Sequence, residues 1–94
     1  MIRPLTREQR IRRGESAQQL LDNPLAMAAL DEMQANCFER WAETSHDDVE
    51  GREFNYKLFL AVRLLRGKLA TWSGDAKVEI NNADARKRDD ALYN

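Results

Sequence analysis

Residues 54–72 read FNYKLFLAVRLLRGKLATW, and the fold is decided by this stretch. Its apolar residues recur at alternating intervals of four and three, which is the period of one helical face and not the period of two of a strand. That face comprises Leu58, Val62, Leu65, Leu69 and Trp72, with Phe54, Phe59 and Ala61 beside it. Ser73-Gly74 follows, and glycine commonly lies just past a helix end. The pattern therefore predicts a helix over about 49–72.

A second amphipathic helix is predicted over about 24–44. Pro24 suits the first position of a helix, and no glycine or further proline interrupts the segment. The apolar face of this segment contains Met27, Leu30, Cys37 and Trp41, which places Cys37 among buried residues. Residues 45–51 combine turn formers with acids, and Asp47 or Asp48 could cap the following helix. So short a connection favours an antiparallel helical hairpin.

The ends of the chain are expected to add one short helix and a tail. Thr6 followed by Gln9 fits a capping box, so a helix is predicted over about 7–21, packed across the hairpin or detached from it. Residues 75–94 are mostly polar and are predicted to form a tail that is mobile, or ordered only against a partner. The expected fold is all-α, with a single helical domain over 1–74 and a flexible tail over 75–94.

Composition excludes several classes of protein. A chain of 94 residues with one cysteine, Cys37, and one histidine, His46, cannot form an internal disulfide or a zinc site of four protein ligands. No stretch approaches the ~20 apolar residues that span a bilayer. The sequence also lacks a catalytic triad pattern and a glycine-rich phosphate loop. We therefore expect a non-enzymatic protein without cofactor, metal or small-molecule substrate, neither secreted nor in a membrane.

Charge is divided into blocks along the chain. Residues 1–21 carry a net charge of +3, residues 22–50 carry −7, residues 51–72 carry +4 and residues 73–94 carry −1, which gives the overall −1. The acidic second block and the basic third block favour pairing of the two predicted hairpin helices with each other. Exposed ion pairs contribute only about 0–1 kcal/mol each, so charge would set the register more than the stability.

Arginines of the first block form the one strongly basic feature. Arg3, Arg7, Arg10 and Arg13 recur at helical spacing and would line one helical face. Such a face could contact nucleic-acid phosphates in a salt-dependent way. Glu8 and Glu15 dilute it, and the adjacent acidic block would repel nucleic acid. The competing hypothesis is that these arginines pair with the acidic helix predicted over about 24–44 or with a protein partner.

Several short runs carry a resemblance to a known group of proteins. They are Arg13-Gly14-Glu15-x-Ala17-x-x-Leu20-Leu21-x-x-Pro24-Leu25, then Trp41 before a short turn, then Glu50-Gly51-Arg52-Glu53, and then Leu65-Arg66-Gly67-x-Leu69. In order and spacing these runs resemble small uncharacterised helical proteins of tailed bacteriophages and prophages, over about residues 12–74. The resemblance implies a phage origin, among genes for the virion or its assembly, and hence a location in the host cytoplasm or the virion. It implies no ligand.

A hairpin of this size has too thin a core to be stable alone, so part of its apolar surface is expected to be covered by self-association or by a partner. The face of 49–72 that lies away from the predicted seam is the candidate partner-binding surface. Its residues are Tyr56, Phe59, Leu60, Arg63 and Gly67.

The leading hypothesis is a phage-encoded structural or assembly factor that acts through helix-mediated protein–protein contacts and forms a homo-oligomer. A nucleic-acid-binding packaging or regulatory module, using the N-terminal arginines, is the first alternative. The second is an inhibitor of a host protein whose acidic segment, with Asp31, Glu32 and Glu39, occupies a basic groove.

Overall fold

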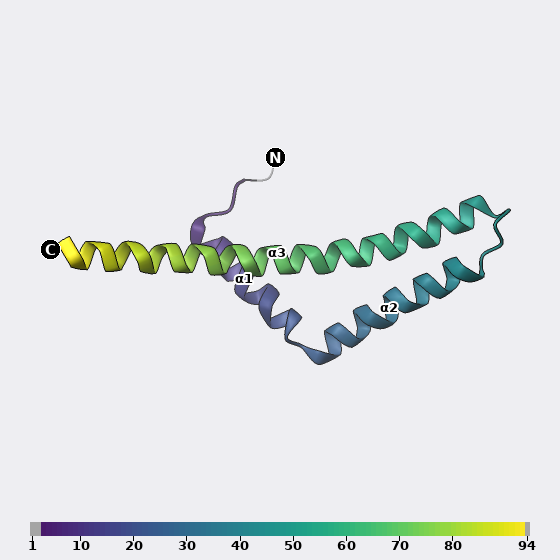
Figure 1. Cartoon of the computed structure of the whole chain (residues 1–94), viewed down its shortest axis with the longest axis horizontal. Coiled ribbons are helices and arrows are strands. Elements are labelled where there is room, and N and C mark those ends of the chain that lie inside the picture. Colours follow the sequence, from purple (N-terminus) through teal and green to yellow (C-terminus); the bar gives the residue numbers. More distant parts are fainter. Residues whose placement is uncertain (1–2, 94) are drawn as a thin grey trace.

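The computed structural model describes residues 3–93, with side chains for residues 3–88, and contains three helices. Helix α1 spans Arg7–Leu21, α2 spans Pro24–Glu43 and α3 spans Val49–Tyr93. The described residues contain no strand, so the all-α prediction is confirmed. In Figure 1, α3 runs the length of the molecule, α2 lies beside its first part and diverges from it away from the turn, and α1 crosses it further along.

Each helix begins at a side chain that caps its free backbone N–H groups. Thr6 Oγ1 accepts a hydrogen bond from Gln9 N at 3.1 Å, and Gln9 Oε1 accepts one from Thr6 N at 2.9 Å, which is the predicted capping box. Asn23 caps α2 by accepting from Leu25 N and Ala26 N. Asp48 Oδ1 accepts from Gly51 N at 3.0 Å at the start of α3. The starts of the helices are therefore set by local hydrogen bonds.

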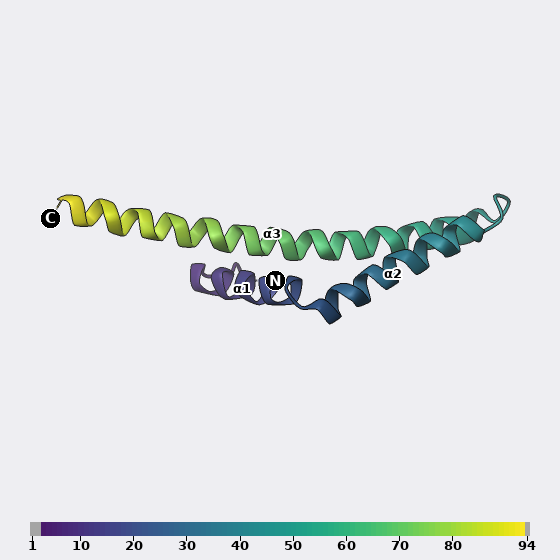
Figure 2. The ribbon, with the colours of Figure 1, turned by 60° about the horizontal axis from the view of Figure 1, so that its bottom comes forward.

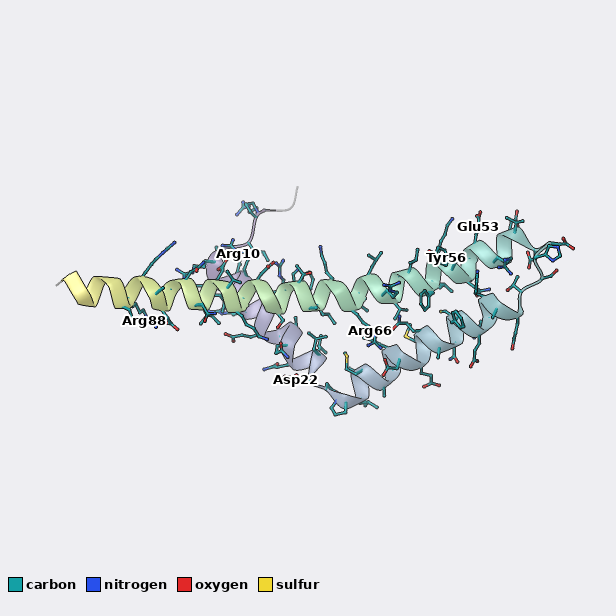
Figure 3. All side chains as sticks on the ribbon, viewed as in Figure 1. Arg10, Asp22, Glu53, Tyr56, Arg66 and Arg88 are labelled. Atoms are coloured by element: carbon teal, nitrogen blue, oxygen red, sulfur yellow. The ribbon has the colours of Figure 1, made fainter. Side chains whose placement is uncertain are left out.

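One stripe along α3 packs against both other helices. We call it the buried stripe: it recurs at alternating intervals of four and three and consists of Asn55, Phe59, Val62, Arg66, Leu69, Ser73 and Ala76. Its first part contacts α2, where the Phe59 and Phe38 rings lie 6.3 Å apart and the Arg66 guanidinium bonds the Asp31 carboxylate. Figure 3 shows Arg66 pointing toward α2. Its last part contacts α1.

The predicted end of the third helix at Ser73-Gly74 is wrong. Helix α3 continues through Gly74, which does not have a positive φ, and reaches Tyr93. The predicted bounds 49–72 and the irregular tail over 75–94 are thus replaced by regular helix as far as residue 93, and residue 94 lies outside the described residues. The cause is tertiary, because Ser73 and Ala76 are buried against α1, and this burial offsets the cost of about 1 kcal/mol for a glycine inside a helix.

The contact between α1 and α3 is a close crossing of small residues. Gly14 and Ala17 of α1 are buried against this part of α3. A Cβ on Gly14 would overlap the Ala76 Cβ and the Trp72 carbonyl oxygen, so only glycine allows this approach. The Ser73 hydroxyl donates a hydrogen bond to Gln18 Oε1 beside the crossing. Figure 2 shows α1 lying along the same side of α3 as α2.

The molecule is far from spherical. Its principal extents are 71 × 33 × 19 Å and its Cα radius of gyration is 19.7 Å, whereas a compact chain of this length would have a radius of about 12 Å. The accessible surface is 7719 Å², against about 5,600 Å² for a typical folded monomer of this mass. The excess of about 2,100 Å² follows from the elongated shape, and part of it is apolar, since large side chains such as Leu25, Phe54 and Leu64 are more than half exposed.

Candidate functional site: the apolar faces of α2 and α3

Large apolar side chains remain exposed on both sides of the α2–α3 pair. The described side chains include no large residue that is fully buried, and the buried hydrophobic residues are Ala17, Cys37, Val62, Leu69 and Ala76. A globular domain of ordinary shape would bury several large side chains. The candidate functional site of this chain is therefore a surface and not a cleft with convergent polar groups.

The predicted partner-binding residues lie together on one side of α3. Tyr56 and Phe59 line a small apolar pocket of about 130 Å³ with Phe38 and Trp41 of α2. The Arg63 guanidinium lies 6.0 Å from the Phe59 ring centroid. This aromatic face is partly closed by α2, since Phe59 belongs to the buried stripe.

The other two predicted partner-binding residues, Leu60 and Gly67, differ in their solvent exposure. Leu60 is half-buried. Gly67 is exposed, and a Cβ built on it would meet no atom within 4 Å. Whether any of the five binds a partner stays a prediction.

A larger apolar groove lies on the other side of the α2–α3 pair. It has a volume of about 460 Å³, and its walls include Leu30, Met33 and Cys37 of α2 and Leu58 and Leu65 of α3. Met33 and Leu65 are 52% and 50% exposed, although both have neighbours across the groove. Water therefore reaches much of its apolar lining.

Sequence reasoning misplaced part of this groove. It assigned Leu58 and Leu65 to the seam between the two helices, but Leu58 is 36% exposed and Leu65 half exposed, and α2 instead meets the buried stripe. Two interleaved patterns of four and three run along α3, and the sequence did not show which one α2 would cover. We call the uncovered one the exposed stripe: Phe54, Leu58, Ala61 and Leu65.

Most of the candidate nucleic-acid-binding arginines have partners within the chain. Arg10 Nε lies 2.7 Å from Glu79 Oε1, and Arg7 donates a hydrogen bond of 3.2 Å to the Glu79 backbone carbonyl. The Arg13 guanidinium lies 4.5 Å from the centroid of the Trp72 ring. Arg3 is exposed. Figure 3 shows Arg10 where α1 crosses α3.

Glu79 is the partner that sequence reasoning missed. It was assigned to the tail, where no contact was expected, yet its side chain is only 23% exposed and lies between two arginines of α1. No local signal identifies this contact, because Arg10 and Glu79 are far apart in the sequence. Ser73, Ala76 and Glu79 are three residues apart, so they share one helical face only if the helix continues past Gly74.

The other polar features have local structural roles. His46 Nε2 lies 3.2 Å from Asp47 Oδ1 in the exposed turn, and Asp48 caps α3. Cys37 is buried, as predicted. Among the side chains that the structure describes, no three His, Cys, Asp or Glu residues are grouped so that they could hold a metal ion. Over residues 3–93, none of the helices combines the length and the apolar character needed to cross a bilayer.

Comparison with known proteins gave no match among family models, curated proteins or solved structures.

Proposed function

We propose that this chain is a non-enzymatic, phage-encoded structural or assembly factor that acts through helix-mediated protein–protein contacts, in the host cytoplasm or in the virion. The observation that carries the proposal is the excess accessible surface of about 2,100 Å² relative to a typical monomer. A standard interface covers about 800 Å² on each partner. The uncovered helical faces thus have the area and the apolar character of a protein interface.

The contacts of the arginines support protein binding over nucleic-acid binding. Arg7, Arg10 and Arg13 already contact Glu79 or Trp72, so a phosphate group would have to compete with these interactions. A titration of the full chain with duplex and single-stranded DNA at two salt concentrations addresses this alternative. We expect no binding at physiological salt, because arginines that are already paired release few counterions from DNA.

The proposal is tested by copurification with defined proteins. The full chain is coexpressed with the virion and assembly proteins encoded near its gene, and complexes are analysed by sedimentation. We expect self-association or a stoichiometric complex with one of those proteins. We also expect Leu65→Asp to weaken that association, since Leu65 is a half-exposed apolar residue of the groove. Leu64→Asp is the matched control, because Leu64 is exposed and does not line the groove.

The proposal would be contradicted if the wild-type chain stays monomeric at about 100 μM and also forms no complex with any of these proteins. At this concentration, even an interface with a binding free energy of only about −6 kcal/mol would be substantially populated.

A further inference from the structure

The exposed stripe of α3 has the spacing of a helix–helix seam but is left largely uncovered by the part of the chain that the structure describes. Its residues follow one another at intervals of four, three and four, which is the a/d spacing of a coiled coil. Phe54 is 62% exposed and Leu65 is 50% exposed. The stripe is therefore a preformed half of a helix–helix interface.

The intervals between the residues of this stripe are the same when the stripe is taken in the opposite direction along the helix. If two copies of α3 lie antiparallel about a two-fold axis between Leu58 and Ala61, then Phe54 meets Leu65 of the second copy and Leu58 meets Ala61. Both pairings combine a larger side chain with a smaller one, which suits interdigitated packing. A two-fold interface requires such self-complementarity.

Charges at the two ends of the stripe match in the same register. Glu50 lies four residues before Phe54 and Lys68 lies seven residues after Ala61, so both share the side of α3 that carries the stripe. In the antiparallel register, Glu50 of each copy lies one residue from the position opposite Lys68 of the other, a difference of about 1.5 Å along the helix that the two long side chains can span. In a parallel pair, like charges would face each other at both ends.

The position of helix α1 also argues against a parallel arrangement of the two copies. Trp72 lies seven residues after Leu65 and so continues the same side of α3, and there it is covered by Arg13 of α1. Two parallel copies would bring both α1 helices into the space between the two α3 helices. In an antiparallel pair, each α1 lies beyond the opposite end of the shared seam.

We infer that the exposed stripe is the seam of an antiparallel, two-fold homodimer in which a second copy of this chain covers Phe54, Leu58, Ala61 and Leu65. The inference rests on the proposed function and names its first partner as the chain itself. The total accessible surface exceeds that of a typical monomer by about 2,100 Å², and each partner contributes roughly 800 Å² to a standard interface, so the elongated chain has surface to spare for a dimer.

Charge reversal tests the partner and the orientation together. Sedimentation equilibrium of the full chain gives the dimer Kd. Lys68→Glu places two carboxylates opposite each other at both ends of the antiparallel dimer, and we expect the Kd to rise about tenfold. Glu50→Lys should have a similar effect, because it places two ammonium groups opposite each other. In an equimolar mixture, the mixed dimer pairs a carboxylate with an ammonium group at both ends and has no like-charge pair, so the variants should prefer each other over themselves.

The control for these variants is Glu53→Lys, because Glu53 is also near the start of α3 but lies about 100° around the helix from Phe54 and about 140° from Leu58, off the exposed stripe. It should leave the Kd unchanged. A Kd that does not change with Lys68→Glu would overturn the antiparallel seam, since in a parallel pair like charges face each other before and after the reversal.

Apolar substitutions test the stripe itself. Leu65→Asp should raise the Kd by at least about 100-fold, because a buried apolar contact is replaced by an unpaired charge. Leu64→Asp should change it little, since the adjacent Leu64 is 73% exposed and lies off the stripe. Circular dichroism of each variant confirms that the helices are retained. Equal effects of the two substitutions would contradict the inference.

The result also separates this inference from the proposed function. A wild-type monomer at about 100 μM that still binds a virion protein overturns the homodimer and leaves the proposed function standing, whereas a monomer that binds none overturns both.

Discussion

Gly14 and Gly74 both lie inside helices, but their surroundings give opposite expectations for the same substitution. Gly14 is buried where α1 crosses α3 and has no space for a Cβ. Gly74 faces open space, with no atom within 4 Å of an added Cβ. One glycine is therefore required by a close approach of two helices, and the other is a local weakness in a long helix.

Gly74→Ala should raise the free energy of unfolding by about 0.5–1 kcal/mol, because alanine has the higher helix propensity and meets no steric obstacle here. Urea unfolding followed by circular dichroism measures the change. An unchanged or lower stability would mean that the backbone at residue 74 is not helical in solution.

Gly14→Ala should lower the free energy of unfolding by about 1–3 kcal/mol, as overpacking of a close contact typically does. The added methyl group would push α1 away from Trp72 and Ala76. Ser16→Ala is the control, since Ser16 is an exposed residue of the same helix. If Gly14→Ala were stabilising, helix propensity alone would govern this position and the crossing would not form as described.

At the scale of elements, α1 and the second half of α3 depend on each other. Helix α1 contacts α3 through Trp72, Ser73, Ala76 and Glu79, and most of these residues lie at or beyond the position where the sequence predicted a helix end. An isolated helix of 15 residues is marginal in water. The stability of α1 should therefore come mainly from this contact.

Truncation after Gly74 should consequently unfold α1 although every α1 residue remains. Hydrogen exchange should show the amides of 7–21 protected in the full chain and unprotected in the chain 1–74. The chain 1–88 is the matched control, because it keeps Ala76 and Glu79, and its α1 amides should stay protected. Protection of α1 in the chain 1–74 would instead support a domain boundary at residue 74.

The ion pair between α1 and α3 should add little to this docking. The Arg10 side chain is 40% exposed, so solvent screens its interaction with Glu79. A double-mutant cycle with Arg10→Gln and Glu79→Gln should give a coupling energy of about 0.5 kcal/mol in low salt and less in about 1 M salt. A coupling of several kcal/mol that persists in high salt would show that the pair, and not the small-residue crossing, holds α1.

At the scale of the whole molecule, shape is the property that follows most directly from the fold. Small-angle scattering of the Leu65→Asp variant, which we expect to be monomeric, should give a radius of gyration near 19.7 Å, and not the roughly 12 Å of a compact chain. The reason is that α3 alone is 45 residues long, which corresponds to about 67 Å of helix. A compact value would mean that α3 bends or folds back in solution.

The sequence by itself determined the helices and where they begin. Thr6 with Gln9, and Asp48 before Val49, act through hydrogen bonds within a few residues, and Pro24 marks the start of α2, so these signals can be recognised without knowledge of the rest of the chain. The same holds for the burial of Cys37, which follows from helical periodicity.

Only the tertiary structure decided where α3 ends, which of its two apolar stripes is covered, and where the arginines of α1 are paired. Each of these depends on contacts between residues far apart in sequence: Ser73 and Ala76 with α1, the buried stripe with α2, and Glu79 with Arg10. Glycine at 74 and the polar composition after it favour a helix end locally, and the energy of burying small residues against a second helix overrides that preference.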